Sequence, residues 1–201
     1  MRTERNKDGT WNVWMSRDEY HELPRSASSF QREIAIRLMG DCGLRVAETL
    51  DVTPEHVTRT KDGRHHQLEV VSGKDTTGEY DGGKYRETWV PRDVEVLLAR
   101  YEQENDLDPE DPFIDVKKRQ VQNWVNDAAD AAAEETSDDD YRKISTHDLR
   151  RCWANHLLVE ENVSPRIVMA LGGWSSYDAI EPYLAAPTED NIIESMSQVS
   201  L

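Results

Sequence analysis

Two side chains that suit an oxyanion stand three residues apart in Thr-His-Asp-Leu-Arg, residues 146–150. If this segment is helical, His147 and Arg150 project from the same face. A guanidinium fork and the N-terminus of a helix both favour a phosphate or a similar anion, so the pair suits a phosphate site. The motif is short and frequent, and a solvated helix face is the alternative interpretation.

A second arginine lies in the apolar segment Cys-Gly-Leu-Arg-Val-Ala-Glu-Thr-Leu, residues 42–50. Arg45 and Glu48 are again three residues apart, and their apolar neighbours place them at the edge of a buried helix. A partly buried guanidinium requires a carboxylate or a phosphate as partner. The two alternatives are therefore a ligand site and an internal Arg45–Glu48 ion pair.

Lys74 follows Ser72 and Gly73 in a Gly-rich stretch between two alternating segments. The stretch is not a nucleotide-binding P-loop, because Asp75 stands where Ser or Thr is required and the context is strand to strand. A lysine on a hairpin can reach into a site from above, whereas a solvated loop lysine is the simpler interpretation.

A fourth motif begins with Leu-Gly-Gly-Trp at residues 171–174, and Tyr183 follows Trp174 by nine residues. Aromatic residues at such positions are common in protein cores. Taken alone, this motif therefore predicts core packing. Tyr177 is a nearby second phenol.

The elements that must position these residues follow from the hydrophobic period. Residues 1–10 show no pattern, whereas residues 67–71 and 85–90 alternate as antiparallel strands do. Ser16 and Glu19 form a capping box, and Ser28 or Ser29 starts the next helix. We predict a mainly α protein with a small three-stranded antiparallel β-sheet (α+β). The expected longer helices are 16–23, 26–44, 45–50, 94–101, 118–135, 145–159 and 165–171.

Composition first argues against a nucleic-acid partner. The chain has 201 residues, with 24 Lys and Arg against 40 Asp and Glu and a net charge of −16, whereas proteins that hold DNA by bulk electrostatics are basic. A dispersed acidic surface poor in Lys suits molar salt, which screens its self-repulsion. We predict a halophilic archaeon or its virus as the source; an ordinary acidic protein is the alternative.

Other classes are disfavoured by what the sequence contains. No apolar run approaches the ~20 residues of a membrane span, and no signal peptide is recognisable, so a cytoplasmic protein is expected. Cys42 and Cys152 lie far apart in apolar patterns and are expected to be buried thiols. His65 and His66 have no further ligands at suitable spacing, so we expect no metal and no cofactor.

In this order and spacing, the four motifs resemble the catalytic domain of the tyrosine recombinases, the phage integrase family. The family pattern has Gly-Leu-Arg-x-x-Glu, a hairpin Lys, His-x-x-Arg on a helix, a His or Trp after Leu-Gly, and a later Tyr. The residues that fill it here are Arg45, Glu48, Lys74, His147, Arg150, Trp174 and Tyr183. The resemblance covers residues 26–186. Residues 1–25 are expected to be an N-terminal extension or linker remnant, and residues 187–201 a C-terminal tail helix.

The resemblance implies site-specific DNA recombination through a 3′-phosphotyrosyl intermediate, with Tyr183 as nucleophile. It also implies that Arg45 and Arg150 clamp the phosphate, that Lys74 protonates the leaving oxygen and that His147 accepts a proton or donates to the phosphate. Trp174 would supply an N–H donor and packing, and Glu48 would orient Arg45 or the helix of His147. The alternatives are a non-catalytic DNA-binding or regulatory relic and a type IB topoisomerase-like nicking and closing enzyme.

The implied partner is double-stranded DNA at a specific site, with no membrane. A homotetramer is expected on DNA, and a monomer or weak association without it. The tail helix would pack either on its own domain or on a neighbouring protomer. The basic residues expected to face DNA are Lys117, Lys118, Arg119, Arg142 and Lys143.

Overall fold

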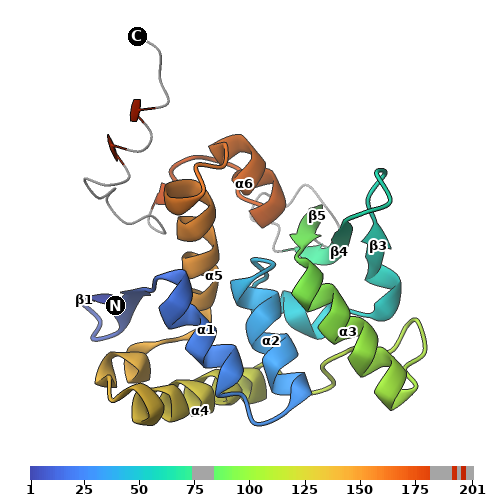
Figure 1. The fold of residues 1–201 in the computed structure, drawn as a ribbon, viewed down its shortest axis with the longest axis horizontal. Helices are drawn as coiled ribbons and strands as arrows, with labels where there is room; N and C mark the ends of the chain where they lie inside the picture. Colours follow the sequence, from blue (N-terminus) through green and yellow to red (C-terminus); the bar gives the residue numbers. More distant parts are fainter. Residues whose placement is uncertain (74–83, 182–191, 194–195, 198–201) are drawn as a thin grey trace.

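The structure is a computed structural model that describes residues 1–73, 84–181, 192–193 and 196–197. The predicted fold class is confirmed: helices dominate, and a three-stranded antiparallel sheet packs against them (Figure 1). The helices are α1 (Arg17–Arg25), α2 (Phe30–Gly40), α3 (Arg92–Asn105), α4 (Lys118–Thr136), α5 (Thr146–Asn155) and α6 (Pro165–Gly172). The strands are β1 (Arg2–Arg5), β2 (Trp11–Trp14), β3 (Val57–Arg59), β4 (His66–Gly73) and β5 (Lys84–Val90). Short helical turns are η1 (Glu48–Asp51), η2 (Pro54–His56), η3 (Asp139–Lys143) and η4 (His156–Glu160).

The starts of α1 and α2 agree with the predicted capping residues because each has a local side-chain cap. The Ser16 hydroxyl accepts the backbone N–H of Glu19 while the Glu19 carboxylate accepts the N–H of Ser16, which is the predicted capping box of α1. The Ser29 hydroxyl accepts the N–H of Arg32 and starts α2. Such caps depend on residues only three apart, so sequence suffices to find them.

Two helical predictions need correction. The helix expected over residues 45–50 is a turn followed by the single 3₁₀ turn η1, because Gly43 takes a left-handed conformation and the Glu48 carboxylate binds the backbone N–H of Arg45. The helix expected over residues 145–159 keeps α-geometry only in α5 and widens into the π-type turn η4.

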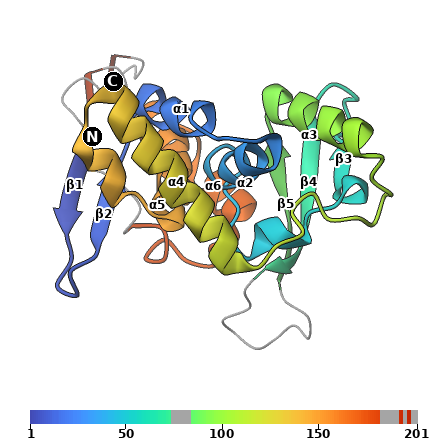
Figure 2. The same ribbon diagram turned by 90° about the horizontal axis from the view of Figure 1, so that it is seen from below.

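The three-stranded sheet has the order β3-β4-β5 with antiparallel pairing throughout. Val70 lies opposite Arg86 and Leu68 opposite Thr88, and all four side chains are buried. One face of β5 is therefore buried although it carries a charged residue. Figure 2 shows α3 along the sheet, while α6 packs against β5.

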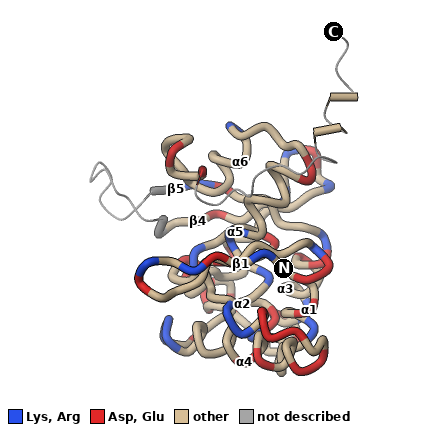
Figure 3. The backbone as a smooth tube through the Cα atoms, turned by 90° about the vertical axis from the view of Figure 1, so that its left-hand side faces the viewer, with Lys and Arg blue, Asp and Glu red and all other residues tan. Residues whose placement is uncertain are grey.

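The first strand pair was not predicted. Residues 2–5 and 11–14 form the antiparallel hairpin β1–β2, although residues 1–10 show no hydrophobic pattern. A hydrogen bond attaches the hairpin to α5: the backbone N–H of Val13 donates to the Asp148 carboxylate at 3.0 Å. Figure 3 faces this hairpin and shows basic and acidic residues mixed along β1.

The main core joins α1, α2, α4 and part of α5. Tyr20 and Leu23 of α1 belong to the same buried cluster as Ile34 and Leu38 of α2, so residues within 1–25 contribute to the core that the predicted catalytic domain uses. The domain boundary at residue 25 stays a prediction. Within the described ranges, the longest helices carry too many polar residues to cross a membrane.

Candidate active site

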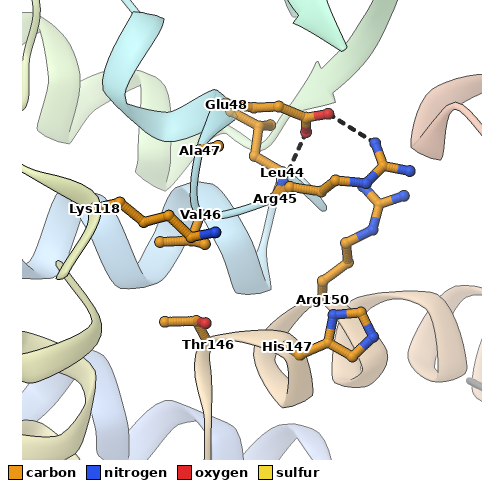
Figure 4. A pocket seen from close by; sticks show the side chains of 9 residues that line it. All are labelled: Leu44, Arg45, Val46, Ala47, Glu48, Lys118, Thr146, His147 and Arg150. Carbon is orange, nitrogen blue, oxygen red and sulfur yellow. Dashed lines mark hydrogen bonds and ion pairs between the residues drawn. The ribbon is translucent and has the colours of Figure 1, made fainter. Parts of the chain in front are cut away.

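The candidate active site is a pocket of about 350 Å³ between the loop after α2 and the beginning of α5. Its chemically active lining comes from Arg45 and Glu48 on one wall, His147 and Arg150 on the other, and Lys118 at the start of α4. Figure 4 shows both guanidinium groups and the imidazole reaching the same side of this pocket. The fold thus brings the Arg45 motif and the His147 motif, about one hundred positions apart, to one pocket.

Arg45 and Glu48 make the ion pair that the sequence left as an alternative to a ligand site. Nη1 of Arg45 donates to Oε1 of Glu48 at 2.7 Å, and the backbone N–H of Arg45 donates to Oε2, also at 2.7 Å. The Arg45 side chain is nevertheless 30% exposed and lines the pocket. The ion pair therefore orients Arg45 toward the pocket and does not remove it from the site.

Arg86 on β5 was missed by the sequence analysis. Its two Nη atoms donate to the two carboxylate oxygens of Glu48 at 2.9 and 2.7 Å, and its Nε donates to the carbonyl of Leu171 at 2.9 Å. Burial alone would raise the pKa of Glu48, but the hydrogen bonds and charges of Arg86 and Arg45 outweigh burial and lower that pKa to about 2. Glu48 is therefore a permanent anion between two arginines.

One sequence signal could have identified Arg86. It alternates with Thr88 and Val90 on a predicted strand, which places a charged residue on the buried face. A buried arginine requires an anionic partner, and Glu48 was the carboxylate already assigned to a buried edge. The ion pair with Arg45 is consistent with the expectation that Glu48 orients this arginine, and the second partner of Glu48 is Arg86 on β5.

Arg150 is held more tightly than Arg45 and is 1% exposed. It donates through Nη1 to the carbonyl of Gly43 and through Nη2 to the carbonyl of Gly172 at 2.5 Å. Its guanidinium carbon lies 4.1 Å from the ring centre of Trp174, which stacks on Trp153 at 5.9 Å. Arg150 also lines the pocket, so these contacts fix the position of its guanidinium group beside the cavity.

Trp174 is thus a support for Arg150 and is itself buried. The space around Trp174 and Trp153 explains why glycine stands at positions 172 and 43. A Cβ on Gly172 would lie 1.9 Å from the Trp174 ring, and one on Gly43 would lie 2.5 Å from the Trp153 ring. The small residues let two tryptophans approach the backbone whose carbonyls bind Arg150.

His147 stands at the mouth of the pocket and is partly exposed. Desolvation by the surrounding protein lowers the pKa of His147 from 6.5, and the positive charges of Arg151, Arg150 and Arg45 lower it further, against an opposing effect of Asp148. The imidazole is therefore neutral at pH 7 and able to accept a proton.

The predicted basic residues divide into two groups. Lys117, Lys118 and Arg119 are exposed at the beginning of α4, and none of the ion pairs among the described residues involves them. Arg142 instead binds Asp130 at 2.9 Å and Asp139 at 3.2 Å, and Lys143 binds Asp140. Only the first group is available to a phosphate without breaking an ion pair.

The remaining candidate residues are the two cysteines, the hairpin lysine and the two tyrosines. Cys42 and Cys152 are buried thiols, as expected, and burial raises the pKa of both. In the ranges that the structure describes, no three His, Cys, Asp or Glu side chains are grouped as metal ligands. Lys74 and Tyr183 lie outside the described residues. Tyr177 is described, and it is 53% exposed in the segment after Trp174.

Comparisons with known proteins identify a family and a shared fold. The model of the phage integrase family matches residues 14–189. XerA recombinase superposes with a TM-score of 0.70 at 19% identity, over 94% of this chain and 66% of its own. The XerH site-specific recombinase bound to difH substrate in a pre-cleavage complex superposes with a TM-score of 0.67 at 16% identity, over 97% of this chain and 59% of its own.

The Tn1549 transposon integrase in complex with transposon right end DNA gives a TM-score of 0.69 at 14% identity, over 94% of this chain and 66% of its own. This chain therefore spans less than two thirds of the length of each of these three proteins. Identities this low show a shared fold. The comparison with curated proteins finds no match.

Proposed function

Because this chain belongs to the phage integrase family, we propose that it is a tyrosine-type site-specific DNA recombinase that works through a 3′-phosphotyrosyl intermediate. The observation that carries the proposal is the convergence of Arg45, Arg150 and His147 in one pocket. Several positive or polar donors around one cavity suit the dianionic, five-coordinate transition state of phosphoryl transfer. Since the covalent intermediate conserves the bond energy of the phosphodiester, strand joining needs no ATP.

The proposed cleavage step balances protons as follows. The phenol oxygen of Tyr183 attacks the scissile phosphorus, the bond from phosphorus to the 5′ oxygen breaks, and the phenol proton passes to His147. Lys74 gives a proton to the departing 5′ oxygen, which leaves a 5′-hydroxyl. The roles of Tyr183 and Lys74 rest on the family pattern in the sequence, and the neutral state of His147 suits a proton acceptor.

Arg45 and Arg150 would bind the non-bridging oxygens, because a planar fork matches a phosphate better than a point charge does. Both are oriented before DNA arrives, Arg45 by Glu48 and Arg150 by two backbone carbonyls and Trp174. Such preorganised donors avoid reorganisation during the reaction. Lys118, which lines the pocket, and its neighbours Lys117 and Arg119 would bind flanking phosphates.

A covalent adduct assay tests this function. The protein is incubated with nicked suicide duplexes carrying candidate sites in molar KCl, and an adduct that survives SDS is measured. Tyr183→Phe should abolish the adduct, and Tyr177→Phe, the matched control, should retain it. Arg45→Ala should slow adduct formation by about 10²–10³-fold.

Three outcomes would contradict the proposal in different ways. An adduct that survives Tyr183→Phe and disappears in Tyr177→Phe would move the nucleophile to Tyr177. Site-specific DNA protection without any adduct would favour the non-catalytic relic. Relaxation of supercoiled DNA without dependence on a site would favour the topoisomerase-like enzyme.

We further propose that the protein assembles as a tetramer on its DNA site. The described residues of the predicted tail helix are helical, and Ile192, Ile193 and Met196 are about half exposed. Exposed apolar residues on a tail suit docking on a neighbouring protomer. Mass photometry with and without a duplex site should give four protomers on DNA and one without it, whereas a monomer on an occupied site would refute the assembly.

The charge of −16 supports a proposed origin in a salt-rich cytoplasm. In molar salt the repulsion among the acidic groups is screened, whereas in dilute buffer it destabilises the compact state. Unfolding after dialysis into low salt, and refolding in molar KCl, is the expected result. Unchanged stability without salt would leave an ordinary acidic protein.

A further inference from the structure

A second groove, of about 430 Å³, lies directly beside the candidate active site. The hairpin β1–β2 supplies one wall through Trp11 and Asn12, and η3 and α5 supply the other through Lys143 and Arg151. His147 lines both this groove and the pocket of the candidate active site. A polymer bound across the pocket would therefore meet the groove next.

The chemistry of the groove suits a nucleic acid. The Trp11 ring has the Lys143 ammonium 4.4 Å from its centre and the Arg5 guanidinium carbon at 5.9 Å. Nη2 of Arg151 donates to the side chain of Asn12 at 2.9 Å. Aromatic faces, cations and amides are the groups by which proteins contact bases and phosphates.

The charge of this region contrasts with that of the whole chain. Arg142, Lys143 and Arg151 line the groove against the single carboxylate of Asp148, in a protein whose net charge is −16. Ion pairs with acidic neighbours hold these cations when no ligand is bound. An isolated anion must compete with each pair, whereas a polyanion offers several phosphates at once and releases counterions at each.

The arrangement of the elements places the hairpin and the pocket along one side of the molecule. In Figure 2 the turn of the β1–β2 hairpin, the beginning of α4 and the ends of β4 and β5 nearest to Gly73 and Lys84 project in the same direction. Lys118 at the beginning of α4 lines the pocket between them. A duplex lying over the pocket would thus have the hairpin on one side of the scissile phosphate.

We propose that the β1–β2 hairpin is a DNA-contacting arm that reads the duplex on one side of the scissile phosphate. Arg5 and Lys143, which both lie near the Trp11 ring, contact phosphates, and the exposed turn at residues 7–10 enters the major groove. A two-stranded β-ribbon fits the ~12 Å width of that groove. This inference rests on the proposed recombinase function and adds a specificity element to it.

A footprinting experiment tests the arm. Tyr183→Phe protein is used so that the duplex stays uncleaved, and Arg5→Ala with Lys7→Ala removes two exposed charges from the hairpin. The hydroxyl-radical footprint should shorten on one side of the cleavage site only, and the negative slope of log K against log salt should become shallower by about one, because Arg5 is the proposed phosphate contact of the two. The matched control is Arg92→Ala with Arg100→Ala, which removes two exposed charges from α3 on the opposite side of the molecule (Figure 1).

The outcomes separate this inference from the function on which it rests. If wild-type protein forms the adduct but the hairpin variant keeps the full footprint and salt slope, the arm is refuted and the recombinase function stands. If the α3 variant shortens the footprint equally, the effect is one of net charge, and the arm is again refuted. If wild-type protein neither forms an adduct nor protects DNA, both proposals fail.

Discussion

Replacing Arg86 by Met removes a charge that the buried Glu48 needs. Glu48 is 3% exposed, and Arg86 binds both of its carboxylate oxygens. Without Arg86, the carboxylate keeps only the partly exposed Arg45. We therefore expect Arg86→Met to leave a poorly compensated buried charge, which is among the most destabilising single changes.

The magnitude follows from the pKa of Glu48. Its lowering from 4.5 to about 2 is the net effect of burial, which raises the pKa, and of Arg86 and Arg45, which lower it; a shift of this size corresponds to roughly 3 kcal/mol, since a tenfold change in proton affinity is worth about 1.4 kcal/mol. Removing one partner of a buried ion pair costs about 3–5 kcal/mol in other proteins, which agrees. The expected loss of about 3 kcal/mol should lower Tm by about 6–12 °C for a chain of this size.

The pH dependence gives a sharper test than the loss alone. Because the folded-state pKa lies below the unfolded value of 4.5, the stabilisation is fully present above pH 4.5 and is lost as pH falls toward 2. The difference in unfolding free energy between wild type and Arg86→Met should thus be largest at neutral pH and shrink below pH 4.5.

Urea unfolding in molar KCl at several pH values measures this difference. Glu48→Gln and the double variant complete a cycle, in which the double variant should lose less stability than the sum of the single changes. A loss below about 1 kcal/mol at pH 7, or a difference that does not change between pH 7 and pH 3, would refute the assignment of Arg86 as the main partner of Glu48.

Three further predictions concern other contacts. Gly43→Ala should lower the free energy of unfolding by about 2–4 kcal/mol, because Gly43 has φ +71° and an added Cβ would meet the Trp153 ring. Gly63→Ala is the matched control: Gly63 has φ +68° but open space around it, so the loss in thermal or urea unfolding should be only about 1–2 kcal/mol. DNA affinity of Tyr183→Phe protein, measured by anisotropy, should increase as the pH falls below 6.5, because the lowered pKa of His147 keeps the imidazole neutral above that pH and a protonated imidazole attracts a phosphate; His147→Gln should flatten this dependence. The two buried cysteine thiols should react with a disulfide reagent only at the rate of unfolding, and a fast reaction in native protein would contradict their burial.

The helices and the main strands were predictable because their signals are local. Caps such as Ser29 act over three residues, and the spacing of His147 and Arg150 places both on one helix face whatever the rest of the fold does. The alternation of β5 similarly predicts a strand. The hairpin β1–β2 was not predicted because its strands show no hydrophobic alternation and the contact that ties it to the rest of the fold comes from α5, more than one hundred residues away.

By itself, the sequence determined the order of the elements, the motifs of the phosphate site and the family resemblance, because periodicity and residue spacing are properties of the chain. Only the tertiary structure decided which charges neutralise one another. In the folded protein Arg86 binds Glu48, and Arg150 packs on the Trp174 ring. The groove beside the β1–β2 hairpin and the candidate active site share His147 as a lining residue. Burial makes such pairings energetically decisive, and a buried contact between distant residues leaves no spacing in the sequence by which it can be read.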